Sequence, residues 1–173
     1  MVNKIYITGP VGSGKSTLAW RLSKEFGFVC CELDSIVYEP YPNSSAGNRK
    51  RTEEDRNLLF NAVFSNEKWI IEDAGRKCFE IAWQKADSII LLEPCVNVRK
   101  RRIIFRWIKQ KLHIEKCGYK PTLDMLKAMF RWTKNYEVGT DTLKEKLAPY
   151  KQKISLIRTE RDIQQYINEH LTI

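Results

Sequence analysis

The chain has 173 residues, of which 43% are apolar and 29% are charged, and its formal net charge is +9. This length suffices for one domain with its own core, and the composition excludes a disordered or fibrous protein. The five cysteines are odd in number and lack the spacing of a metal site, so we expect reduced thiols rather than a disulfide framework.

The first part of the chain opens with a predicted strand and a helix. The strand at 4–8 runs into a glycine-rich loop, and apolar residues at helical spacing predict a helix over 15–26. A second strand is predicted at 28–34, where it ends at an acidic residue. Residues 40–50 are rich in Pro, Ser, Asn and Gly, so we expect a polar loop there.

The rest of the chain continues this alternation of helices and strands. The expected elements are, in order, a helix over 53–65, a strand at 69–73, a short helix over 77–86, a strand at 88–93, helices over 96–112 and 122–136, a strand at 153–157 and a helix over 160–170. Such alternation predicts an α/β fold with a mostly parallel sheet. We expect a single domain over 1–173, with 96–138 as a lid and its flanking helices.

The N-terminal residues show no basic region followed by an apolar stretch and a cleavage site, and no apolar run approaches the length of a membrane span. We therefore expect a cytoplasmic protein without a membrane partner. The positive charge is concentrated in residues 97–121, which hold nine Lys or Arg and one acidic residue. An anionic partner is expected at this segment.

Residues 9–17 match the pattern G-x-x-x-x-G-K-[ST], with a predicted strand before the loop and a helix that begins inside it. Glycines allow the backbone amides to converge on one phosphate, and the helix adds its positive N-terminal end. The lysine side chain reaches the β- and γ-phosphates, and the following hydroxyl can bind Mg²⁺. The predicted nucleotide-binding residues are Gly9, Val11, Gly12, Ser13, Gly14, Lys15, Ser16 and Thr17.

The loop alone does not select a reaction, but several classes of nucleotide-binding protein lack support in this sequence. There is no Asn-Lys-x-Asp guanine-recognition motif and no transporter signature, and a motor or helicase core needs a longer chain. The remaining class is the compact P-loop kinase, in which a small acceptor binds beside ATP.

Three carboxylates lie at the ends of predicted strands and are candidates for the chemistry of such a kinase. Ligands of open α/β sheets bind outside the carboxyl ends of the strands. Asp34, at the end of the second strand, is expected to orient or activate an acceptor group or to hold a magnesium-bound water. Either Glu72 or Asp73, at the end of the third strand, is expected to serve the metal, and their position does not decide between them.

The basic segment 99–111 combines apolar residues with arginines, and the arginines have three interpretations. Its apolar residues at helical spacing predict one packing face. Its arginines, including Arg102 and Arg106, could form a solvated stripe or contact nucleic acid, since clustered Lys and Arg bind phosphates. We favour a mobile lid whose arginines close over the phosphates of ATP.

The sequence also resembles a known family. The strings "GPVGSGKSTLA", "ELDSIVYEP", "WIIEDAG" and "ADSIILLEP", with the arginine-rich helix that follows, are similar to the DNA-topology-modulation (FlaR-related) proteins, a branch of the adenylate-kinase-like P-loop kinases. The resemblance implies a five-stranded parallel sheet in the order 2-3-1-4-5, flanking helices and a small helical lid. It also implies ATP with Mg²⁺ at Gly12 to Thr17 and an acceptor near Asp34, and Arg101 best matches a lid arginine.

We therefore expect ATP-dependent phosphoryl transfer to a small molecule, such as a nucleotide, a nucleoside or a related metabolite. Catalytic roles are expected for Lys15, Asp34, Arg101, Arg102 and Arg106, and metal binding for Ser16 with Glu72 or Asp73. The alternative is a nucleic-acid-associated, ATP-binding regulator without a small-molecule acceptor. The protein is expected to be a monomer or a homodimer.

Overall fold

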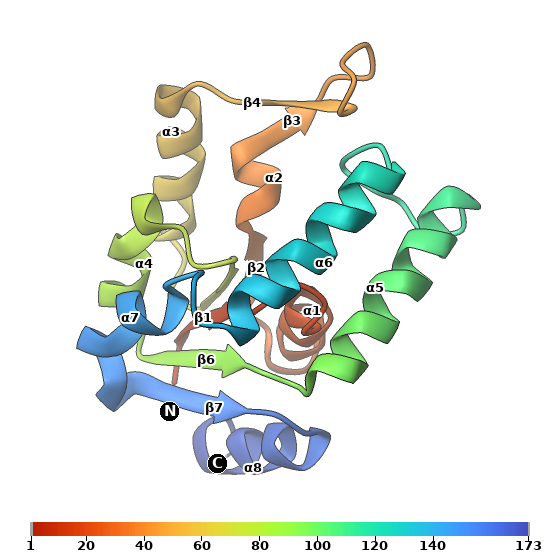
Figure 1. The fold of residues 1–173 in the computed structure, drawn as a ribbon. Helices are drawn as coiled ribbons and strands as arrows, with labels where there is room; N and C mark the ends of the chain where they lie inside the picture. The colour runs from red at the N-terminus through yellow and green to blue at the C-terminus, as the bar shows by residue number, and fades with distance from the viewer. Residues whose placement is uncertain (1, 173) are drawn as a thin grey trace.

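The centre of the molecule is a parallel five-stranded sheet in the order β2-β5-β1-β6-β7 (Figure 1). The computed structural model describes residues 2–172. The strands of this sheet are β1 (Lys4–Thr8), β2 (Val29–Glu32), β5 (Trp69–Glu72), β6 (Ser88–Leu92) and β7 (Ile154–Ile157). Counting only these five strands along the chain, the order is 2-3-1-4-5, so the predicted α/β fold and sheet order are confirmed.

Helices connect the strands and lie on both faces of the sheet (Figure 1). The α-helices are α1 (Lys15–Phe26), α2 (Leu33–Val37), α3 (Glu53–Val63), α4 (Glu80–Lys85), α5 (Val96–Lys111), α6 (Leu123–Glu137), α7 (Leu143–Leu147) and α8 (Glu160–His170). Two short 3₁₀ helices, Lys77–Phe79 and Ala148–Lys153, precede α4 and β7.

Alternation along the buried strands divides the core into two layers. On β1, Ile5 and Ile7 face α1 and α8, whereas Tyr6 between them faces the layer formed by α2, α3, α4 and α7. Both faces of the sheet are covered, which explains why the central strands β5 and β6 are almost continuously apolar. The sheet therefore has a fixed carboxyl edge, where the loops after β1, β2, β5 and β6 meet.

Two segments differ from the sequence-based expectation. Residues 40–50 do not form a plain loop, because β3 (Tyr38–Pro40) and β4 (Asn48–Lys50) pair as an antiparallel hairpin. The predicted second strand ends at Glu32, and its last two residues, Leu33 and Asp34, already belong to α2. The hairpin continues directly from α2 and projects away from the sheet (Figure 1).

The helices α5 and α6 pack against each other, and both are anchored to the body of the protein at their proximal ends. Arg99, whose residue exposure is 1%, donates to the Pro94 carbonyl oxygen at 3.1 Å and pairs with Glu137. The Tyr136 hydroxyl donates to Glu93 at 2.7 Å. The distal ends of both helices and the loop between them lie beyond these anchors (Figure 1).

The apolar face predicted for the basic helix is only partly a packing face. Ile103 is buried, but Ile104, Ile108 and Leu112 are exposed, because α5 packs through the faces of Arg99, Ile103 and Gln110. Within residues 2–172, no helix has both the length and the apolar character that crossing a bilayer requires.

Candidate functional site

The phosphate loop follows β1 and leads into α1, as its motif predicts. Gly12 has φ +75°, and a methyl group there would lie 2.8 Å from the Arg99 carbonyl oxygen and 2.9 Å from Ile103 Cγ1. Glycine is therefore needed both for the backbone conformation and for the close packing of α5 on the loop. The sequence thus places its basic helix directly against the loop that would hold phosphates.

Three side chains meet at the start of α1. The Ser16 hydroxyl donates to Glu72 Oε2 at 3.1 Å, and the Lys15 ammonium lies 3.7 Å from Glu72 Oε1 and 3.3 Å from the Pro10 carbonyl oxygen. Glu72 comes from the end of β5, the strand next to β1, so the sheet order brings it to the loop. This arrangement joins an ammonium, a hydroxyl and a carboxylate at one point.

Glu72 is 8% exposed, and its burial determines its electrostatics. Burial raises the pKa of this carboxyl above its usual value, the charge of Asp34 raises it further, and Lys15 and the Ser16 hydroxyl oppose the rise. Keeping a buried carboxyl ionised costs free energy, and a nearby cation reduces that cost. The position therefore favours a second positive charge beside Glu72.

The next residue, Asp73, has a different environment. It accepts hydrogen bonds from the Tyr6 hydroxyl at 3.1 Å and from the backbone amides of Gly75 at 2.9 Å and Arg76 at 2.6 Å, and it also pairs with the Arg76 guanidinium. Burial and this carboxylate raise the pKa of Tyr6 well above its usual range, so the phenol remains a donor. Asp73 therefore holds the turn after β5, on the Tyr6 side of the sheet.

Asp34 lies in the first turn of α2, with 74% of its side chain exposed. Its carboxylate pairs with Arg76, which at the same time pairs with Asp73. Arg76 thus bridges an exposed acid and a buried acid at the carboxyl edge of the sheet. Together, Asp34 and Arg76 offer one anionic and one cationic group on the side of Glu72 away from α5.

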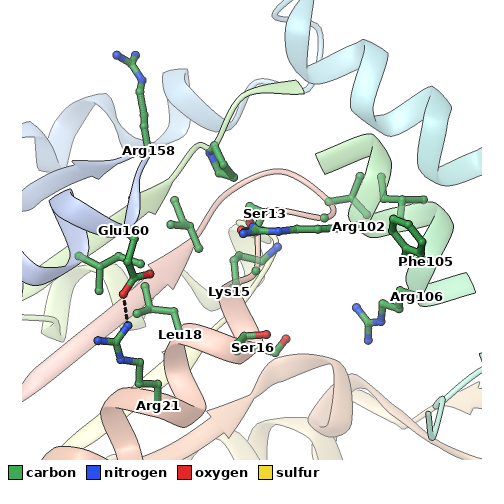
Figure 2. Close-up of a pocket in the computed structure, with 18 of the residues that line it drawn as sticks. Ser13, Lys15, Ser16, Leu18, Arg21, Arg102, Phe105, Arg106, Arg158 and Glu160 are labelled. Carbon is green, nitrogen blue, oxygen red and sulfur yellow. Dashed lines mark hydrogen bonds and ion pairs between the residues drawn. The ribbon is translucent and has the colours of Figure 1, made fainter. Parts of the chain in front are cut away.

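On the other side of the loop, α5 presents arginines to a cavity of about 620 Å³. Arg102 extends from α5 to the phosphate loop and donates to the Ser13 carbonyl oxygen at 2.5 Å, and Arg106 lies one turn further along (Figure 2). Arg106 also pairs with Glu115 in the loop after α5, at 3.1 Å. Both arginines line the cavity together with the phosphate loop.

The remaining wall of the cavity comes from α1 and the start of α8. Arg21 of α1 pairs with Glu160 of α8, and Arg158 stands at the rim (Figure 2). Arg158 also pairs with Glu93, at 3.2 Å. Burial opposes ionisation of Glu93, but Lys144, Tyr136 and Arg158 outweigh it and hold the pKa of this carboxyl below its usual value.

The structure places Arg101 away from this cavity. Its side chain is exposed on α5, and it does not belong to the residues that line the cavity. The helix begins at Val96, and its rotation turns Arg102 and Arg106 toward the phosphate loop. Arg102 and Arg106, rather than Arg101, therefore line the cavity beside the phosphate loop.

We expect Arg102→Ala to lower the rate of phosphoryl transfer on the order of 100-fold, because it removes a preorganised cation beside the phosphates. Arg101→Ala is the matched control on the same helix and should change the rate by less than about twofold. Steady-state kinetics with saturating Mg-ATP measure both. A larger loss in the Arg101 variant would return the lid role to that residue.

The residues fit ATP and Mg²⁺ by their chemistry. The glycine-rich loop offers converging backbone amides, Lys15 offers a cation for phosphate oxygens, and the hydroxyl of Ser16 is a magnesium ligand of the expected type. Glu72 already accepts from Ser16, so it can hold a ligand of the metal in place. The cavity volume lies in the usual range for small-molecule sites.

The sheet order, the loop and the helix that starts in it define the P-loop kinase fold. The structure is similar to a gluconokinase from Sinorhizobium meliloti 1021, with 14% identity over 96% of this chain and 88% of that chain and a TM-score of 0.51. A shikimate kinase from Bacteroides thetaiotaomicron is 18% identical over 98% and 96% of the two chains, with a TM-score of 0.52. Shikimate kinase from Acinetobacter baumannii, in complex with shikimate, is 14% identical over 99% and 97%, with a TM-score of 0.51.

No known family profile matches the sequence, and no curated protein matches it either. At these identities the structural similarities concern the fold alone. The chain therefore has the fold of small-molecule kinases, and its reaction must be argued from its own side chains.

Sequence reasoning did not single out Arg76. Its only signal was a cation three residues after Asp73 and directly after Gly75, in the turn that leaves β5 at the ligand-binding edge of the sheet. The pairing with Asp34 depends on two turns 42 residues apart, which the sequence alone does not bring together.

Proposed function

We propose that the protein is an ATP- and Mg²⁺-dependent kinase of a small molecule. The observation that carries the proposal is the meeting of Lys15, Ser16 and Glu72 at the phosphate loop, at 3.7 and 3.1 Å. A binding module for phosphate needs only the loop, whereas a buried carboxylate beside the magnesium-binding hydroxyl supports Mg²⁺-dependent chemistry at the γ-phosphate. The ion pair of Asp34 and Arg76, on the side of Glu72 away from α5, supplies a place for an acceptor.

The proposed roles divide between the two sides of the cleft. Lys15 and the loop amides hold the phosphates, Ser16 is the metal ligand, and Glu72 positions the metal's water. When bound, Mg²⁺ neutralises charge on the phosphate oxygens. Asp34 orients the acceptor hydroxyl, and Arg102 and Arg106 stabilise the charge that develops on the transferred group. Asp73, proposed from sequence as an alternative metal residue, instead holds Arg76 and the turn.

The acceptor class that we propose is a nucleotide, a nucleoside or a related polar metabolite, with 96–138 acting as the lid. The finer assignment, to the DNA-topology-modulation branch of adenylate-kinase-like proteins, is supported by sequence strings alone. The second candidate is a nucleic-acid-associated regulator that binds ATP. It is favoured by the exposed cations Lys100, Arg101 and Lys111 on α5. A cytoplasmic location and a monomer or homodimer complete the proposal.

A phosphoryl-transfer screen tests the proposal. The protein is incubated with Mg-ATP and nucleotides, nucleosides, sugars and other metabolites, and ADP formation is compared with the rate in water alone. We expect one acceptor class to accelerate ATP consumption strongly. If no acceptor does so and the protein instead binds DNA or RNA with an affinity that falls steeply with salt, the regulator is correct.

A further inference from the structure

The helix α5 stands at the outer edge of the molecule (Figure 1). Two of its faces already have a role. Arg99, Ile103 and Gln110 are buried against the body of the protein, and Arg102 and Arg106 line the nucleotide cavity. The helix therefore has a third face, which serves neither of these contacts.

A row of aliphatic side chains runs along this third face. Ile104, Ile108 and Leu112 are spaced by four residues, so they follow one another along one side of the helix. Their exposed fractions are 42%, 40% and 63%. None of them lines the nucleotide cavity or the neighbouring cavity around Glu93 and Tyr136. The row is therefore part of the convex surface of the molecule and does not form the wall of either cavity.

The chain places a further aliphatic side chain directly after this row. His113 has φ +56°, a left-handed conformation that glycine usually adopts at the end of a helix. The Ile114 amide donates to the Lys109 carbonyl oxygen at 2.9 Å and so closes the last turn. At this position of the motif an apolar residue commonly packs against the helix, whereas Ile114 is 70% exposed. The end of α5 thus presents an aliphatic side chain to solvent from an ordered turn.

Cations accompany the row, and α5 contains no acidic residue. Lys100 begins the row, and Arg101 and Lys111 each lie one turn from one of its members; all three are exposed. Within residues 2–172, the ion pairs of α5 are those of Arg99 and Arg106. The positive charge beside the row is therefore not compensated by a carboxylate. We call Lys100, Arg101, Ile104, Ile108, Lys111 and Leu112 the outer face of α5.

The outer face combines an apolar row with positive charge, and the boundary of an anionic lipid bilayer has the complementary properties. Aliphatic side chains of an interfacial helix enter the region between headgroups and acyl chains, and lysines and arginines beside them contact lipid phosphates. The long stems of these cations cover apolar surface while their charged ends reach the headgroups. Both components of the outer face therefore find a partner in the same surface.

Three other occupants match the outer face less well. Nucleic acid offers phosphates to the cations, but its backbone has no apolar layer for Ile104 and Ile108. A peptide helix docks into a groove, whereas the row lies outside both cavities. A second copy of the chain that joined through the same face would bring like charges together.

We propose that the outer face of α5 binds the surface of an anionic lipid bilayer, with the helix lying in the plane of the interface. This inference goes beyond the proposed function and does not depend on it. Arg102 and Arg106 line the nucleotide cavity from another side of the helix, so contact of the row with a bilayer does not require them. The expectation of no membrane partner rested on the absence of a spanning segment, which an interfacial helix does not need.

Flotation of the full chain with lipid vesicles tests the proposal. Vesicles of phosphatidylcholine with about 30% phosphatidylglycerol should bind the protein at least about 10-fold more tightly than vesicles of phosphatidylcholine alone. Binding should weaken as the salt concentration rises, because salt screens exposed charges. Equal binding to both kinds of vesicle, or binding to neither, overturns the proposal.

The contribution of the apolar row is measured with Ile104→Ser/Ile108→Ser, which should weaken binding to the anionic vesicles by at least about 10-fold. Leu112→Ser changes the most exposed member of the row, where packing within the protein is least, and should act in the same direction. The matched control, Leu58→Ser/Leu59→Ser, removes two exposed leucines of α3 and should change binding by less than about twofold. Binding by the row variants that equals binding by the control contradicts the proposal.

The contribution of charge is measured with Lys100→Gln/Arg101→Gln, which should weaken binding to the anionic vesicles by about 10-fold. The control Lys24→Gln/Lys151→Gln changes the net charge by the same amount at exposed lysines outside α5 and should weaken binding by less than about threefold. Equal losses in the two variants would show that net charge attracts the vesicles, and the outer face would have no special role.

Two competing occupants have separate readouts. A short DNA duplex that binds the protein, loses affinity in Lys100→Gln/Arg101→Gln and is unaffected by Ile104→Ser/Ile108→Ser identifies nucleic acid as the occupant, if vesicles do not bind. Analytical ultracentrifugation without lipid detects a dimer, and a dimer that Ile104→Ser/Ile108→Ser disrupts identifies a second copy of the chain. Either result overturns the bilayer proposal and leaves the proposed kinase function untouched.

Discussion

Lys15→Ala is expected to abolish stabilisation of the protein by Mg-ATP and to lower phosphoryl transfer on the order of 100- to 1,000-fold. The ammonium is the only cation within 4.0 Å of Glu72 among the described residues, and the motif directs it to the β- and γ-phosphates. A ligand present at a concentration 100 times its Kd raises the free energy of unfolding by about 2.7 kcal/mol. For a chain of this length, that corresponds to a rise in Tm of about 5–11 °C. Thermal unfolding with and without Mg-ATP measures this shift.

The matched control for Lys15 is Lys24→Ala, which removes an exposed lysine from the same helix. It should retain both the thermal shift and the transfer rate. The Lys15 variant should remain folded without nucleotide, because Ser16 still donates to Glu72 and the loop glycines are unchanged. Normal Mg-ATP binding by Lys15→Ala would show that the loop is not the nucleotide site.

Glu72→Gln and Asp73→Asn are expected to have opposite effects on activity and stability. Glu72→Gln should lower Mg²⁺-dependent turnover by about 10- to 100-fold, as loss of a residue that positions a metal ligand does. Its Tm should remain the same or rise slightly, since the variant removes a buried charge. Asp73→Asn should lower stability by about 3 kcal/mol, or roughly 6–12 °C in Tm, because one of the two acceptor oxygens becomes an amide donor that faces other donors, and the charge that pairs with Arg76 is lost.

The pH profile separates these roles further. Burial raises the pKa of Glu72, so this carboxyl takes up its proton at a higher pH than an ordinary glutamate. Because the folded-state pKa is the higher one, ionisation of Glu72 reduces stability as pH rises through the interval between the unfolded and folded values. The acid limb of turnover should therefore lie at a higher pH than an ordinary glutamate would give, and Glu72→Gln should remove it. Equal stability losses in the two variants would contradict the division of roles.

The sequence predicted the sheet well because its central strands β1, β5 and β6 are buried and alternate with helical patterns along the chain. The strands around β1 read as apolar runs, and the predicted bounds of the last helix, 160–170, agree with α8. The hairpin was not predicted, since Pro, Asn and Ser at 40–50 indicate turns and give no alternating pattern. Leu33 and Asp34 were assigned to a strand because a helix as short as α2 has too few residues for a 3.6-residue period.

Site residues that lie within one sequence motif were predictable. Site residues that the fold brings together from separate turns were not. The spacing around Lys15 and Ser16 located the phosphate loop directly. The choice between Glu72 and Asp73 depended on which layer each side chain faces, and neighbouring residues at a strand end face opposite layers. The place of Arg76 depends on its contact with Asp34 from another turn, and a linear sequence pattern does not contain such contacts. Which of Arg101 and Arg102 faces the phosphate loop depends on the rotation of α5, which the sequence pattern does not give either.

The ion pair between Arg99, which is buried, and Glu137 fixes the first turns of α5 to the end of α6. A rotation of α5 would therefore pivot near the N-terminus of this helix. The 16 residues of α5 span about 24 Å, so a rotation of about 10° at the pivot would displace the far end by about 4 Å. Arg102, close to the pivot, would move by a fraction of that distance, so its contact with the Ser13 carbonyl oxygen can persist while the distal end of α5 moves.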